Sequence, residues 1–285
     1  MKETVELRVN YDYAHLLFKA DEGKDLGDML GPSIKLVEIS KEDPRYSQIP
    51  IINEEIEKKY GRSFFYGWDI KRKYTKEELD AATLLHFIIK AAFEPTGEEC
   101  GTVYDEAIAC EICGANRKQV GPLILKKGRI PKKDIARTIG GEVVVSEKFA
   151  NAVRQRNLKG LQLTSINVEK YYQLVTSSEI ELSINTITGV NPWDFSEGCD
   201  ECAFNVSGSE IKFEKEIYKC PKGDTIGLNL LSEPYVLSNP LIGKCDFFAS
   251  KQKFGVKRGL LRPEPIYFCS PALNQNRAKS GTDHE

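Results

Sequence analysis

The sequence predicts an α+β protein with mixed or antiparallel sheets, short helices and a cysteine-ligated zinc site. Three features support this prediction: alternating stretches typical of strands, capping signals for short helices only, and two Cys-x-x-Cys pairs spaced like metal ligands. With 285 residues and 41% hydrophobic content, the chain can bury a core of its own. These values exclude a disordered chain and a disulfide-stapled miniprotein.

The first predicted strand covers residues 3–9, where apolar and charged side chains alternate. This period of two indicates an edge or half-exposed strand. A short helix is expected after Thr75, because Glu78 stands three residues later and each side chain can bind a free backbone N–H of the first turn. The apolar run 84–93 that follows fits a buried strand.

A strand–helix–strand unit is predicted within residues 142–167. Three consecutive valines form the first strand, and Ser146 can cap the helix that follows. The helix presents Phe149 and Val153 on one face, since they stand four residues apart. Gly160 is expected to close the helix in the left-handed conformation, before a second alternating strand.

The predicted domain organisation has a boundary near residue 95, where turn-forming residues interrupt the pattern. Residues 1–95 are expected to form an N-terminal α+β region, and residues 96–272 a zinc-stabilised α+β domain. A fainter strand–helix–strand pattern at 246–268 suggests an internal duplication. The polar tail 273–285 lacks any apolar period and is expected to be disordered.

The chain is expected to be cytoplasmic, and this expectation bears on its eight cysteines. The first residues alternate charged and apolar side chains, without the apolar segment of a secretory signal. No apolar run approaches the ~20 residues of a membrane span. In a reducing compartment cysteines serve in metal binding, redox chemistry or simple burial more often than in disulfides.

The strongest site prediction is a structural Zn²⁺ bound by Cys110, Cys113, Cys199 and Cys202. Each pair has two residues between its thiols, which lets one tight turn direct both sulfurs to a point about 2.3 Å away. The two pairs stand much further apart than the ~15–20 residues of a compact zinc ribbon. The tertiary fold must therefore bring them to one ion.

Two alternatives stay open for these cysteines. Zinc at the first pair can be completed by Cys100 or His86 instead, or the thiols can be buried without a metal. The remaining three cysteines stand singly beside apolar or turn residues. We expect Cys220, Cys245 and Cys269 to be small buried hydrophobic residues.

Motifs that would predict catalysis are missing from the sequence. The chain has three histidines and no HExxH, GxSxG, P-loop or strand-linked GxGxxG motif, so no enzymatic role is expected. A basic stretch begins at Lys126 and ends at Arg137, with six basic residues and one acid. It is the basis of an alternative function, nucleic-acid binding, but the net charge of −2 favours an ordinary solvated surface.

In these cysteine pairs and in its strand–helix segment, the chain resembles the double-CXXCG motif proteins, a bacterial family. The resemblance rests on Cys110-Glu-Ile-Cys113-Gly114, on Cys199-Asp-Glu-Cys202 and on the strand-and-helix segment 143–153. It implies a zinc-containing immunity protein of a polymorphic toxin system, which neutralises a cognate toxin by binding and occluding it. The partner implied is thus the toxin protein; the near-neutral net charge disfavours nucleic acid as a partner, and no membrane contact is expected.

Overall fold

A computed structural model of the chain describes residues 1–18, 28–189, 192–193 and 219–271. The fold is mixed α+β, with many strands and few short helices, as expected from the sequence. Within these ranges no helix combines the length and the apolar character needed to cross a bilayer. The predicted disordered tail lies outside the described residues.

Two compact units make up the chain. The first is Met1–Ala81 with Asn191–Ser196, and the second is Ala82–Val190 with Glu197–Glu285. The boundary predicted at residue 95 therefore falls inside the second unit. The correction has a physical cause: β4 (Leu85–Phe87) and β5 (Ala92–Phe93), which both precede residue 95, pair with strands of the second unit.

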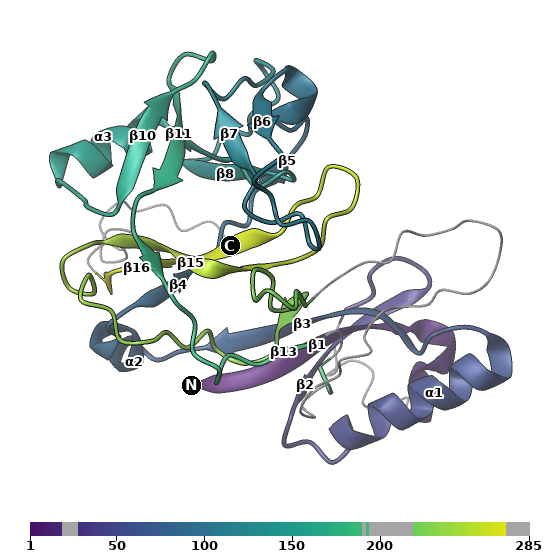
Figure 1. Cartoon of the computed structure of the whole chain (residues 1–285). Coiled ribbons are helices and arrows are strands. Elements are labelled where there is room, and N and C mark those ends of the chain that lie inside the picture. Colours follow the sequence, from purple (N-terminus) through teal and green to yellow (C-terminus); the bar gives the residue numbers. More distant parts are fainter. Residues whose placement is uncertain (19–27, 190–191, 194–218, 272–285) are drawn as a thin grey trace. The chain divides into compact units, whose positions relative to one another are not determined.

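The first unit is a three-stranded antiparallel sheet of order β2-β1-β3 with a helix against one face (Figure 1). Its elements are β1 (Lys2–Asn10), η1 (Tyr11–Leu16), β2 (Ile34–Ser40), η3 (Tyr46–Gln48), α1 (Ile49–Tyr60), β3 (Phe65–Lys73) and α2 (Lys76–Ala81). Val5, Leu7 and Val9 of β1 are buried in the same core as Ile49 and Ile56 of α1. The predicted first strand is confirmed, but it is central in its sheet, since β3 pairs with its second edge.

The predicted cap of α2 is confirmed. The backbone N–H of Thr75 donates to a Glu78 carboxylate oxygen at 2.8 Å, and the N–H of Glu78 donates to the Thr75 hydroxyl at 3.2 Å. Each side chain thus binds a backbone N–H of the first turn that has no partner within the helix.

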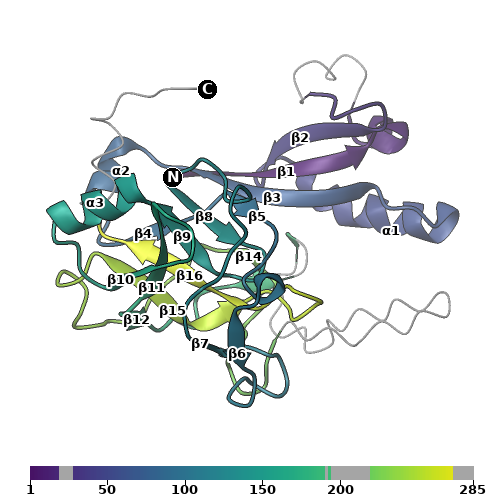
Figure 2. The same cartoon turned by 90° about the horizontal axis from the view of Figure 1, so that it is seen from above.

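The second unit contains a five-stranded sheet of order β10-β11-β9-β8-β5 and a four-stranded sheet of order β12-β15-β16-β4 (Figure 2). Two small two-stranded sheets, β6-β7 and β13-β14, accompany them. The elements are β4 (Leu85–Phe87), β5 (Ala92–Phe93), η4 (Glu98–Cys100), β6 (Val103–Asp105), β7 (Lys118–Val120), β8 (Ile135–Thr138), β9 (Val143–Ser146), α3 (Glu147–Gln155), β10 (Leu161–Ser165), β11 (Tyr171–Thr176), β12 (Glu179–Ile180), β13 (Thr188–Gly189), β14 (Asn229–Leu230), β15 (Phe247–Phe254) and β16 (Glu264–Cys269).

One strand of each larger sheet, β9 and the first half of β15, is buried on two faces, which explains its continuous apolar run. Val143 and Val145 of β9 share a core with Phe247 of β15, so this core joins the two sheets. Val144 points the other way, into a separate cluster, as the alternation of side chains along a strand requires. Phe248 likewise points into a cluster on the opposite face of its own sheet.

The predicted strand–helix–strand unit is confirmed as β9-α3-β10. The Ser146 hydroxyl accepts the backbone N–H of Phe149 at 3.2 Å, which caps α3. The helix does not end at Gly160, however, because Asn157 adopts the left-handed conformation three residues earlier (φ +51°). The N–H of Leu158 donates to the carbonyl of Val153 at 3.1 Å and completes a Schellman motif.

Two other predictions are corrected. The run 84–93 forms two short strands in different sheets, β4 and β5, and only Ile89 among its residues is fully buried. The segment 246–268 forms β15 and part of β16, which pair as antiparallel neighbours without a helix between them. This hairpin does not repeat the β9-α3-β10 unit.

Candidate metal centre

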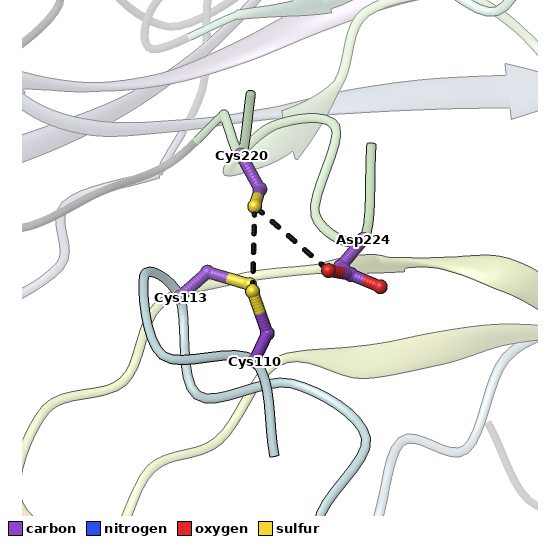
Figure 3. Close-up of side chains that lie close together, drawn as sticks. All are labelled: Cys110, Cys113, Cys220 and Asp224. Carbon is purple, nitrogen blue, oxygen red and sulfur yellow. Dashed lines mark hydrogen bonds between the residues drawn. The ribbon is translucent and has the colours of Figure 1, made fainter. Parts of the chain in front are cut away.

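Four side chains from two distant segments lie together in the second unit (Figure 3). They are Cys110, Cys113, Cys220 and Asp224, and their ligand atoms all lie within 4.8 Å of one another. Cys113 and Cys220 are buried, whereas Cys110 and Asp224 are half-buried. Across the described ranges, no second group of three or more histidine, cysteine or acidic side chains is arranged in this way.

The first knuckle (residues 110–115) lies in the loop between β6 and β7, which pair in antiparallel fashion. The backbone N–H of Cys110 donates to the carbonyl of Ala115 at 2.8 Å, and the N–H of Gly114 donates to the carbonyl of Cys110 at 2.8 Å. Gly114 adopts a left-handed conformation (φ +67°) that most residues with a Cβ avoid. The Cys-x-x-Cys-Gly sequence therefore forms the tight turn that its spacing predicted.

The second knuckle (residues 220–225) has a similar hydrogen-bonded frame, but its glycine stands three residues after the cysteine instead of four. The N–H of Cys220 donates to the carbonyl of Thr225 at 2.6 Å, and the N–H of Gly223 donates to the carbonyl of Cys220 at 2.8 Å. Gly223 is left-handed (φ +79°), as Gly114 is in the first knuckle. Lys219 and Ile226 form an antiparallel bridge beside this turn, so it too is the tip of a small hairpin.

Backbone and side-chain contacts hold Asp224 in place. The N–H of Lys253 in β15 donates to the backbone carbonyl of Asp224 at 2.7 Å. The Asn116 amide donates to one oxygen of the Asp224 carboxylate at 2.8 Å. The other oxygen lies 3.9 Å from the sulfur of Cys220, toward the cluster. Asn116 thus orients the carboxylate as outer-shell partners of metal ligands do.

The sulfur spacing matches a metal site better than a disulfide. The sulfurs of Cys110 and Cys220 lie 3.6 Å apart, well beyond the ~2.05 Å of an S–S bond. Tetrahedral zinc with Zn–S bonds of ~2.3 Å places its sulfur ligands ~3.8 Å apart. Three thiolates and one carboxylate are ligand types that zinc accepts, and soft sulfur ligands disfavour Mg²⁺ and Ca²⁺.

The two knuckles also shift the acidity of their thiols. Burial alone raises the pKa of Cys220, but the backbone N–H of Lys222 and the Cys110 thiol bind its sulfur and hold the pKa below the ordinary value. A backbone hydrogen bond from Cys113 lowers the pKa of Cys110, whereas burial and the Asp224 carboxylate together raise it to about 11. Metal binding would displace the proton of the Cys110 thiol, because only the thiolate is a metal ligand.

The structure brings the two predicted ligands Cys110 and Cys113 together. Cys199 and Cys202 lie outside the described residues, so their role stays a prediction. The predicted burial of Cys220 is confirmed, with 4% of its surface exposed, but the residue also lies in the candidate ligand cluster, which the sequence reasoning did not foresee.

The alternative ligands and the remaining cysteines lie elsewhere. Neither Cys100 nor His86 belongs to the cluster, which corrects the proposal that they complete the first pair. Cys245 is half-buried and accepts a hydrogen bond from the Ser178 hydroxyl. Cys269 packs in the core between the two sheets, and its burial raises its pKa to about 11. Cys269 is thus the buried hydrophobic residue that the sequence predicted.

Sequence reasoning missed Cys220 and Asp224, although a local signal exists. The sequence Cys220-Pro-Lys-Gly223-Asp224 contains a proline and a glycine, as a tight turn does. One residue more separates its two ligands than in Cys-x-x-Cys, and the second ligand is an acid. Acids follow glycine in many solvent-exposed turns, so the signal gains weight only once the fold brings Cys110 close.

Comparison of the chain with protein-family models, with curated proteins and with solved structures gave no match. A proposed function therefore rests on the candidate metal centre and on the sequence resemblance.

Proposed function

We propose that the protein binds one structural Zn²⁺ through Cys110, Cys113, Cys220 and Asp224. The observation that carries this proposal is the convergence of four ligand atoms within 4.8 Å, on two turns that are each closed by a bond from the cysteine N–H to the carbonyl five residues on. Hydrogen bonding of Asn116 to Asp224 supports it, since ordinary surface acids need no such positioning.

A structural role fits this ligand set better than a catalytic one. Four protein ligands fill a tetrahedral site and leave no position for a water molecule, whereas catalytic zinc keeps one position open. The ion would join the β6-β7 loop to the turn that docks on β15. Two segments about a hundred residues apart in sequence would thus be held at fixed separation, which limits local opening of this part of the second unit.

We further propose that the zinc-stabilised unit acts as an immunity-type binding protein for a cognate bacterial toxin. The resemblance to the double-CXXCG motif proteins supports this role, through Cys110-Glu-Ile-Cys113-Gly114 above all. The mechanism is occlusion: a preformed surface covers the toxin's active site. A surface held rigid by zinc loses little conformational entropy on binding.

The test has two readouts. Purified protein should contain one zinc per chain by elemental mass spectrometry, and the Cys220→Ser variant should contain none. Co-expression with the product of the neighbouring gene should protect cells from that product, and the two proteins should co-purify. Protein without zinc would disprove the metal proposal, whereas zinc-loaded protein that neither protects nor binds would disprove the immunity role alone.

A further inference from the structure

A loop of the second unit carries a concentration of unpaired positive charge. This basic loop (residues 126–133) follows the first knuckle in the chain, between β7 and β8. Its exposed cations are Lys126, Lys127, Arg129, Lys132 and Lys133. Within the described part of the chain none of the five forms an ion pair, unlike nearby Arg137, which binds Glu264 at 2.5 Å.

The backbone of the basic loop is fixed by apolar anchors. Leu125 and Ile130 are buried, with 2% and 8% of their surfaces exposed, in one cluster with Val144 of β9. The Asn167 side chain donates to the carbonyl of Leu125 and accepts its N–H, at 2.9 and 2.8 Å. The loop is therefore ordered before any partner arrives, and binding requires little further ordering of the backbone.

Neighbouring acids do not neutralise the loop. Asp134 directly follows it, but its carboxylate binds the Lys148 ammonium at 3.1 Å and the Ser146 hydroxyl at 3.0 Å. The overall balance of 40 basic and 42 acidic residues thus conceals a local excess of positive charge.

The composition of the loop indicates the kind of partner. No aromatic or large apolar side chain is exposed between residues 126 and 133. A protein interface needs such anchors at its centre and is depleted in lysine. Single-stranded nucleic acid is bound by aromatic stacking, which this loop cannot supply. Lysine and arginine without such anchors suit the phosphates of a duplex, which need only cations.

We propose that the basic loop binds the phosphate backbone of duplex nucleic acid without reading its bases. This surface is separate from the metal centre, and the proposal does not depend on toxin binding. Each phosphate neutralised releases counterions, and the logarithm of the association constant falls by about 0.9 per tenfold rise in salt for each contact. Five contacts give a slope of about −4.5, or a loss of about 500-fold between 50 and 200 mM salt.

The test uses the full chain and a fluorescein-labelled 20-base-pair DNA duplex, with anisotropy measured from 50 to 200 mM KCl. The double variant Lys126→Gln/Lys127→Gln should bind more weakly and lower the slope by about 1.8, since two contacts are removed. The control variant Lys58→Gln/Lys59→Gln removes the same charge from α1 of the first unit. It should leave the affinity for the duplex and the salt slope unchanged. Unchanged melting temperatures will show that both variants fold.

Three results would overturn the proposal. The first is an absence of duplex binding at 50 mM KCl. The second is an equal loss of binding in the control variant, which would indicate an effect of overall charge. The third is competition by a polyglutamate peptide as strong as that by unlabelled duplex, which would assign the basic loop to an acidic protein partner instead.

Discussion

Changing either of two buried cysteines to alanine removes one sulfur atom. Comparing the two variants distinguishes a metal ligand from a cysteine that is only buried. Cys220 and Cys269 are matched, with 4% and 3% of their surfaces exposed, but only Cys220 belongs to the cluster. Without a metal, each change to alanine deletes one buried atom and should lower the free energy of unfolding by about 1 kcal/mol.

If the cluster binds zinc, the free energies of unfolding of the two variants should differ strongly. Structural zinc in small peptides contributes about 10–16 kcal/mol, comparable to the ~5–15 kcal/mol of a whole domain. Losing one of four ligands should therefore lower the free energy of unfolding by about 4 kcal/mol or more for Cys220→Ala. The expected loss for Cys269→Ala stays near 1 kcal/mol, since this residue belongs to a buried apolar cluster and not to the candidate ligand group.

Urea unfolding in reducing buffer, with zinc and then with excess chelator, measures both losses. With zinc, Cys220→Ala should be much less stable than Cys269→Ala. With chelator, the free energy of unfolding of the wild type should fall close to that of Cys220→Ala. Equal losses in the two variants, together with a wild type that the chelator does not destabilise, would refute the metal-centre reasoning.

Two further predictions concern acid–base behaviour and positioning. Burial raises the pKa of Glu264 to about 7 although Arg137 opposes the shift, and Glu142 adds to it. The folded state therefore binds this proton more tightly than the unfolded state, and stability should fall by up to about 3 kcal/mol as pH rises from 4.5 to 7. Urea unfolding at pH 5 and pH 8 should show this loss in the wild type and a smaller one in Glu264→Gln, and an unchanged loss would count against the assignment. The Asn116→Gly variant keeps the left-handed backbone but removes the amide that orients Asp224, so zinc affinity, measured by chelator competition, should fall about 10–100-fold. Unchanged affinity would show that the amide has no such role.

Local features of the fold could be predicted from the sequence. The capping pair Thr75 and Glu78 and the cap Ser146 use hydrogen bonds between residues three apart, so the sequence contains all the partners. The turn at Cys110 and Cys113 is local in the same sense. In each case short-range geometry decides the structure, and tertiary packing does not override it.

Features that depend on distant partners could not be predicted. The alternation of residues 3–9 shows a strand but not that β3 will pair with its free edge. Gly160 carries a helix-ending signal, yet α3 ends at Gln155 and the left-handed residue that follows it is Asn157. Gly160 (φ +92°) is needed for another reason, because a Cβ there would lie 2.2 Å from the carbonyl oxygen of Phe247. Cys220 reaches Cys110 only because its hairpin docks on β15.

X-ray absorption at the zinc edge of the purified protein tests the central claim most directly, since it reports the ligand atoms themselves. Binding by Cys110, Cys113, Cys220 and Asp224 predicts three sulfurs at about 2.3 Å and one oxygen at about 2.0–2.2 Å. The Asp224→Ala variant should keep the three sulfurs and change only the oxygen shell. Four sulfurs in the wild type, or protein without zinc, would contradict this ligand set.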